Sequence, residues 1–187
     1  MIQIPENVTR QLDQRLAAVD DCAKQAAHET FEAAGSLLSA VLNGRRIYVC
    51  ACNARVMLAQ HFAQLMCGQF EHERPGLPVI ALTGMSNEIS SVADAIRAAG
   101  SVDDVLFVIA EQETGAVLPA IHSAHERDMQ VVLLTNGREE VVEPHLHTSD
   151  RLICTNTEQR GTQLQTHLLL IHTLVGLIDR QLLGINE

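Results

Sequence analysis

Short continuous apolar runs alternate along the chain with longer segments that have helical spacing. The apolar runs have the length of strands, and we expect five strands, at about 46–51, 79–82, 104–110, 130–135 and 151–155. Helical spacing fills the intervals, over about 54–68, 87–99 and 115–127. Strands that are apolar on both faces and alternate with helices are typical of a parallel sheet covered on both sides. The pattern therefore predicts one doubly wound α/β domain over residues 1–187.

Two further helical regions flank this alternating core. Residues 6–42 have helical spacing in two segments, with Leu12, Leu16 and Val19 on one stripe, and Asn43-Gly44 provides the stop. The final helix, over about 159–183, is apolar on nearly every face. Because such a helix must be buried on more than one side, we expect it to contact another subunit. We therefore divide the domain into an N-terminal helical region, 1–43, and a core with the C-terminal helix, 44–187.

Composition narrows the classes of function. The net charge of −10 argues against direct binding of nucleic acid, because nucleic-acid-binding proteins present basic surface. The chain has no apolar run long enough to cross a bilayer and no signal-peptide pattern near residue 1, so we expect a cytoplasmic protein. Five cysteines, mostly in apolar segments, indicate reduced thiols rather than disulfides.

One block of sequence carries a family resemblance. Its residues are Gln60-His61-Phe62-Ala63, Phe70-Glu71, Glu73-Arg74-Pro75, Leu77-Pro78 and Ile80-Ala81-Leu82, with Ile171-His172 and Leu177-Ile178-Asp179 near the C-terminus. In these residues the chain resembles the sugar isomerase (SIS) domain family. Within that family it is similar to the branch of the phosphoheptose isomerases and the DnaA initiator-associating proteins (DiaA), and more similar to the latter. The resemblance implies a flavodoxin-like, five-stranded parallel sheet and a homotetramer.

The family's first phosphate-binding turn has changed. Relatives of the isomerase type carry Gly-Asn-Gly-x-Ser after the first strand, and here the turn is Ala51-Cys52-Asn53-Ala54-Arg55. Without glycines, the backbone cannot approach a phosphate as closely. The guanidinium of Arg55 can bind an anion, although an arginine in the first turn of a helix is more often only solvated. Asn53 and Arg55 are therefore candidate ligand contacts in a cleft that has lost its glycine turn.

The second phosphate contact of the family is a Ser/Thr-rich loop after the third strand. Here that loop carries Glu111, Glu113 and Thr114. A carboxylate about 4 Å from a phosphate costs about 1 kcal/mol per charge pair in water, and several times more in a partly desolvated cleft. The loop after Leu82, which contains Ser86, is also several residues shorter than in the family. We expect the cleft to exclude sugar phosphates, and we retain these four polar residues as candidate contacts of a vestigial site.

The acid–base and metal positions of the isomerases have changed as well. The resemblance places the family's proton-transfer glutamate at Leu65 and a metal-ligating glutamine at Leu164, while His61 and His172 retain histidine. Zinc takes three or four protein ligands, so two histidines alone make a poor site. We expect no catalytic residue, metal or cofactor, and treat His61 and His172 as candidate ligand contacts. Two other closely spaced pairs can bind a metal in principle, but we expect surface residues at His122, His125, His145 and His147.

Three functions follow from these observations. The first, which the resemblance to the DnaA initiator-associating proteins implies, is a non-catalytic homotetramer that binds the replication initiator DnaA and promotes its assembly at the chromosomal origin. Its candidate partner contacts are Leu182 and Leu183, for which burial in the tetramer is the alternative. The second is a sensor of a sugar phosphate or nucleotide sugar in the remodelled cleft. The third, a phosphosugar isomerase, is disfavoured by Leu65 and Leu164.

Overall fold

The computed structural model describes residues 6–82, 89–111 and 114–185. Two helices come first, α1 (Glu6–Gln25) and α2 (Ala27–Leu42). The core continues with β1 (Ile47–Ala51), η1 (Asn53–Arg55), α3 (Val56–Cys67), β2 (Val79–Ala81), α4 (Ile89–Ala99), β3 (Val105–Ile109), η2 (Thr114–Val117), α5 (Leu118–His125), β4 (Gln130–Thr135), α6 (Glu139–Val142), η3 (Glu143–His145), β5 (Arg151–Cys154) and α7 (Arg160–Leu183). The expected alternation of strands and helices is confirmed.

The five strands form one parallel sheet in the order β2-β1-β3-β4-β5. Ile47 of β1 pairs with Val79 on one side and with Val105 on the other, so β1 is flanked by both β2 and β3. The chain passes from β1 to β2 on one side of β1 and then crosses to β3 on its other side, so the order in which strands are added reverses at the boundary between β1 and β3. In open α/β sheets, ligands bind outside the carboxyl ends of the strands at such a switch point.

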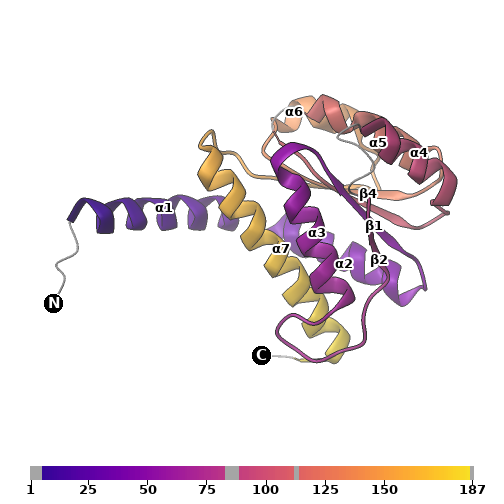
Figure 1. Ribbon diagram of the computed structural model, residues 1–187, viewed down its shortest axis with the longest axis horizontal. Helices are drawn as coiled ribbons and strands as arrows, with labels where there is room; N and C mark the ends of the chain where they lie inside the picture. The colour runs from indigo at the N-terminus through magenta and orange to yellow at the C-terminus, as the bar shows by residue number, and fades with distance from the viewer. Residues whose placement is uncertain (1–5, 83–88, 112–113, 186–187) are drawn as a thin grey trace.

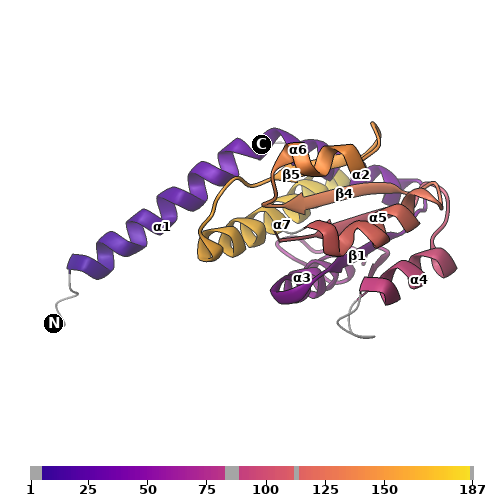
Figure 2. The ribbon, with the colours of Figure 1, turned by 90° about the horizontal axis from the view of Figure 1, so that it is seen from above.

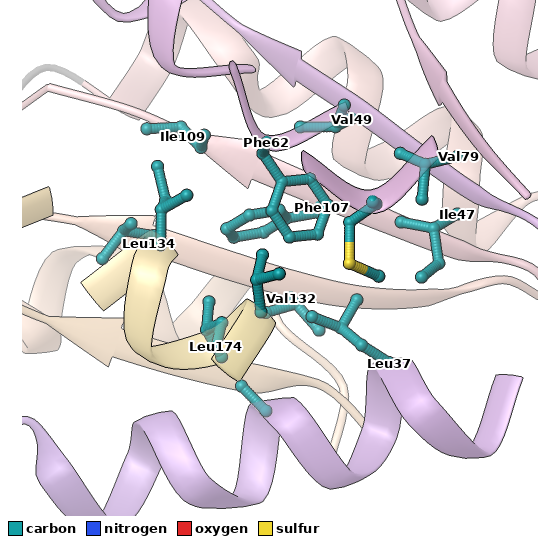
Figure 3. Packing of buried hydrophobic residues seen from close by; sticks show 14 of the residues in the cluster. Leu37, Ile47, Val49, Phe62, Val79, Phe107, Ile109, Val132, Leu134 and Leu174 are labelled. Carbon is teal, nitrogen blue, oxygen red and sulfur yellow. The ribbon is translucent and has the colours of Figure 1, made fainter. Parts of the chain in front are cut away.

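Alternate side chains of the strands enter two separate cores. Ile47, Val49 and Phe107 pack with α2, α3 and α7, whereas Tyr48 and Leu106 pack on the opposite face with α4, α5 and α6. Figure 1 shows these two groups of helices on either side of the sheet. Figure 3 shows the first core, in which Phe62 of α3 meets Phe107 of β3 edge to face. Burial on both faces explains why the strands are continuous apolar runs rather than alternating ones.

The ends of several elements differ from the predicted ones. Helices expected from residues 54 and 115 begin as the short 3-10 segments η1 and η2, and the short elements α6 and η3 had no clear periodic signal. Asp104, expected at the start of the third strand, lies just before it. Its carboxylate accepts hydrogen bonds from the backbone N–H groups of Arg46 (2.9 Å) and Ser101 (3.0 Å). This buried carboxylate joins the segments that lead into β1 and β3.

Helix α1 extends away from the rest of the domain in both views (Figures 1 and 2). Within α1 only Cys22 is buried; of the predicted apolar stripe, Leu12 and Leu16 are exposed and Val19 is half-buried. Helix α7 buries one side in the first core but leaves Leu168 and Leu169 exposed on another. The helices therefore present apolar surface that their own chain does not cover within the described residues. None of the described helices is long and apolar enough to cross a membrane.

Candidate functional site

The changed turn lies at the switch point, directly after β1. Cys52 is extended, with φ −115° and ψ 159°, and Asn53 then adopts the left-handed conformation with φ 52°. Asparagine tolerates this conformation better than most residues that carry a side chain. The chain then enters η1 and α3 without a glycine. The tight turn is therefore retained, but its backbone is flanked by side chains at every position.

Arg55 is turned into the protein rather than into solvent. The residue is only 3% exposed, so the expectation of a solvated arginine is wrong. Its Nη2 donates to Oε1 of Gln163 on α7 at 3.5 Å, and its Nε has no hydrogen-bond partner in the structure as described. Burial lowers the pKa of Arg55, and the nearby Glu111 carboxylate opposes that shift. The guanidinium at this position is thus directed at a helix of its own chain.

Two buried side chains of α7 surround this arginine, and neither was among the candidates from the sequence. Gln163 donates from Nε2 to the carbonyl oxygen of Thr157 at 2.7 Å, which orients its Oε1 towards Arg55. His167 is fully buried, with Nε2 3.1 Å from Oγ1 of Thr155. Burial and the charge of Arg55 lower the pKa of His167 to about 3. A neutral imidazole therefore lies beside the arginine, where a phosphate-binding site would gain from a second cation.

Polar groups from β3 and β4 complete this edge of the sheet. Thr135 donates from Oγ1 to the carbonyl oxygen of Glu111 at 3.2 Å and accepts from the N–H of Gly137 at 3.0 Å. Asn136 is buried, yet neither polar atom of its amide has a partner in the described part of the chain. Buried amides are normally paired, so Asn136 is a position where a water molecule or a polar ligand would complete the hydrogen bonding.

His61 of α3 and His172 of α7 face each other further along these two helices. Their Nε2 atoms are 2.8 Å apart, and the ring of Phe70 lies 5.1 Å from that of His172. Burial and the neighbouring His61 lower the pKa of His172. His61 follows Arg55 by six residues, which is about 9 Å along a helix. His172 follows Gln163 by nine residues, which is about 14 Å along α7. The histidine pair and the arginine are therefore two distinct clusters.

The residues around the histidine pair do not fit the metal site that the resemblance implies. Leu65 and Leu164, at the positions of the missing acid–base and ligand groups, are partly buried against the first core. No third histidine, cysteine or carboxylate among the residues described completes a metal-binding group with His61 and His172. A zinc ion normally takes at least three protein ligands. The two histidines instead contact each other.

A buried ion pair, which sequence reasoning missed, holds α3 and α7 in this arrangement. Arg74 follows α3 in the chain, and its Nε donates to the carboxylate of Asp179 on α7; both side chains are fully buried. Arg74 also donates to backbone carbonyl oxygens of Leu65 (3.1 Å) and Met66 (2.9 Å) at the end of α3. Arg74 and Asp179 belong to the motifs that carried the family resemblance, which is the signal that singles them out. Glu73 beside them is exposed.

The remaining candidates are distributed as follows. Ser86 and Glu113 lie outside the described residues, and Thr114 begins η2. Leu182 packs partly against the first core, whereas Leu183 is 41% exposed. The two leucines therefore have different surroundings, and Leu183 is the one available to a partner of this chain.

Comparison with known proteins places the chain in a family. The SIS domain family matches residues 12–136. The phosphoheptose isomerase of Thiobacillus denitrificans is 33% identical over 178 residues, which cover 89% of this chain and 90% of that protein. That of an Azoarcus species is 31% identical, with 97% and 98% covered. The structure of a phosphoheptose isomerase from Francisella tularensis aligns with a TM-score of 0.83 at 27% identity, covering 94% of this chain and 97% of that one. The protein therefore belongs to the SIS domain family and is related to the phosphoheptose isomerases.

Proposed function

We propose that this protein is a non-catalytic member of the SIS family that acts by assembly and partner binding. The observation that carries the proposal is the packing of Leu65 and Leu164 against the apolar core beside the histidine pair. A general acid or base must lie within about 3.2 Å of the proton that it transfers, or act through a water. A leucine can do neither, and the site has no metal-binding group to replace it in the described residues.

The surroundings of Arg55 support the same proposal. A phosphate needs donors that face the open crevice, but this guanidinium is buried and directed at Gln163. The Glu111 carboxylate is close enough to oppose the lowering of the Arg55 pKa by burial, so it also repels an incoming anion. His167, with its pKa near 3, adds no positive charge at neutral pH.

The partner that we propose is the replication initiator DnaA, on the resemblance to the DnaA initiator-associating proteins. The net charge of −10 fits a protein partner better than a direct contact with DNA. A multivalent assembly can raise the local concentration of bound initiator without chemistry of its own. Exposed Leu183, near the end of α7, is the proposed contact.

Binding of purified DnaA from the same organism to the immobilised protein tests this proposal. We expect Leu183→Ser to weaken binding about tenfold, which corresponds to the loss of a moderate contact of about 1.4 kcal/mol. Val141→Ser is the matched control, because Val141 is also an exposed apolar residue but lies on α6. No binding by the unaltered protein refutes the choice of partner, and equal losses in both variants refute the role of Leu183.

We further propose that the assembly is a homotetramer. The exposed stripe of α1 and the exposed leucines of α7 offer two surfaces for subunit contacts. Sedimentation at micromolar concentration is expected to give a mass four times that of the 20.4 kDa chain. Replacing both Leu12 and Leu16 with glutamate is expected to lower that mass. A monomer of the unaltered protein contradicts the proposal.

A second candidate function is a sensor of a sugar phosphate or nucleotide sugar. The observation that favours it is that Asn136 and Nε of Arg55, both near the carboxyl edge of the sheet, have no hydrogen-bond partner within residues 6–82, 89–111 and 114–185. Thermal denaturation in the presence of a panel of phosphosugars and nucleotide sugars tests it. A stabilising compound whose effect is lost in Asn136→Ala supports the sensor, and a uniformly unchanged melting temperature rejects it.

A further inference from the structure

Two histidines and a buried carboxylate meet at the end of the sheet opposite the crevice. His125 is the last residue of α5, His147 lies in the loop after η3, and Asp150 immediately precedes β5. They therefore gather at the amino end of β5, whereas the switch point lies at the carboxyl ends of β1 and β3. Nothing in the proposed function uses these three side chains.

Their donor atoms converge on one small volume. His125 Nε2 lies 2.8 Å from Oδ2 of Asp150, and the rings of His125 and His147 stack with their centroids 3.7 Å apart and 15° between their planes. One ligand atom from each of the three residues lies within 4.8 Å of the others. In a tetrahedral zinc site with bonds of about 2.0–2.1 Å, ligand atoms are about 3.4 Å apart. The ion must also lie near the plane of each imidazole that binds it, so the exposed ring of His147 has to rotate out of the stack before the three atoms can meet at a common ion.

The carboxylate of this cluster is fixed in advance by the backbone. Asp150 Oδ1 accepts from the N–H of Val131 at 2.8 Å, and Oδ2 accepts from the N–H of His147 at 2.7 Å. The side chain of Asp150 is only 1% exposed and that of His125 10%. These hydrogen bonds explain why an aspartate is buried here. They do not explain why two imidazoles converge on it, and hydrogen bonds of this kind orient the ligands of metal sites.

We propose that His125, His147 and Asp150 form a binding site for a divalent transition-metal ion of the Zn²⁺ type. Two imidazole nitrogens and one carboxylate oxygen are ligands that zinc accepts, and water completes the coordination. His147 is exposed and lines depressions of about 840 and 490 Å³, so an ion can enter from solvent. Binding through Nε2 of His125 places the proton of this ring on Nδ1. The ion would join the end of α5 to the start of β5, which are 25 residues apart in the chain.

Equilibrium titration of the reduced, tag-free full-length protein with Zn²⁺ against a chelating dye tests the proposal. We expect one strong equivalent per chain, which also raises the melting temperature because the ion binds the folded state. His147→Gln removes an exposed ligand and is expected to weaken Zn²⁺ binding at least about tenfold, since even residues behind the ligands contribute 10–100-fold. Asp150→Asn is expected to weaken it similarly, while its remaining carbonyl oxygen can still accept from Val131.

Two control variants separate this site from other zinc-binding groups. His122→Gln removes an exposed histidine one turn earlier on α5, and His172→Gln removes a member of the pair at the crevice; both are expected to leave the strong equivalent in place. Titration with Co²⁺ is expected to give no thiolate absorption band, because the three ligands include no cysteine. The proposal is overturned if His147→Gln binds Zn²⁺ as tightly as the unaltered protein, or if His172→Gln abolishes the strong site.

Discussion

Replacing Asp179 with asparagine tests whether the buried Arg74–Asp179 pair fixes the two helices of the site. Both side chains are fully buried, so Asp179→Asn leaves the guanidinium of Arg74 charged and without its counterion. Removing one partner of a buried ion pair typically costs about 3–5 kcal/mol. Arg74 keeps its hydrogen bonds to carbonyl oxygens at the end of α3, which places the expected loss near the lower figure, about 3 kcal/mol.

Urea denaturation at one fixed protein concentration measures this loss. The unfolding midpoint is expected to fall, because the free energy of unfolding falls while its dependence on urea stays the same. Asp20→Asn is the matched control: its partner Lys24 is largely exposed, so the midpoint is expected to stay unchanged. Since the pair joins α3 to α7, nuclear magnetic resonance of the histidine rings is also expected to show His61 and His172 separating. A loss below about 1 kcal/mol for Asp179→Asn refutes the reasoning.

Three further predictions concern the crevice. The pKa of His167 is about 3 in the folded chain and near 6.5 in the unfolded chain, so the unfolded state takes up a proton at higher pH than the folded state does. The free energy of unfolding is therefore highest above pH 6.5, and below that pH it decreases by up to about 1.4 kcal/mol per pH unit. His172, whose pKa is also lowered, adds to the slope, and His167→Gln is expected to flatten it in urea denaturation between pH 5 and 7. Arg55→Met is expected to leave the unfolding midpoint at pH 7 unchanged or higher, because the buried guanidinium has one long hydrogen bond among the residues described; a clear fall contradicts this. The same variant is expected to weaken the pH dependence, since the charge of Arg55 helps to lower the pKa of His167.

The fold was predictable because the three central strands, β1, β3 and β4, are buried on both faces. That burial makes β1, β3 and β4 continuous apolar runs, and the order of the sheet followed from the family resemblance. Short elements such as α6 and η3 escaped prediction, because four or three residues cannot show a period of 3.6. The helical spacing predicted the apolar stripe of α1, but the sequence does not say which surface covers that stripe.

At the candidate site the sequence indicated which positions differ from the family, but not the contacts that surround Arg55. The family resemblance assigned Leu65 and Leu164 to the positions of the acid–base and ligand groups. In the structure both leucines pack against the first core. The inward turn of Arg55 could not be foreseen, because it depends on Gln163, more than a hundred residues away in the chain. His167 lay hidden in a helix that is apolar all round, where a buried histidine differs little in pattern from a surface one. The three-residue cluster at His125 depends on a loop that has no periodicity.

We propose that the crevice does not perform isomerisation. Incubation of the purified protein at micromolar concentration with sedoheptulose 7-phosphate, with and without added Zn²⁺, measures this most directly by following the appearance of the isomerised product. We expect no conversion above the rate without protein, because Leu65 cannot transfer a proton and His61 and His172 lack a third ligand within the described residues. Conversion by the unaltered protein that is abolished in His172→Ala would contradict the account.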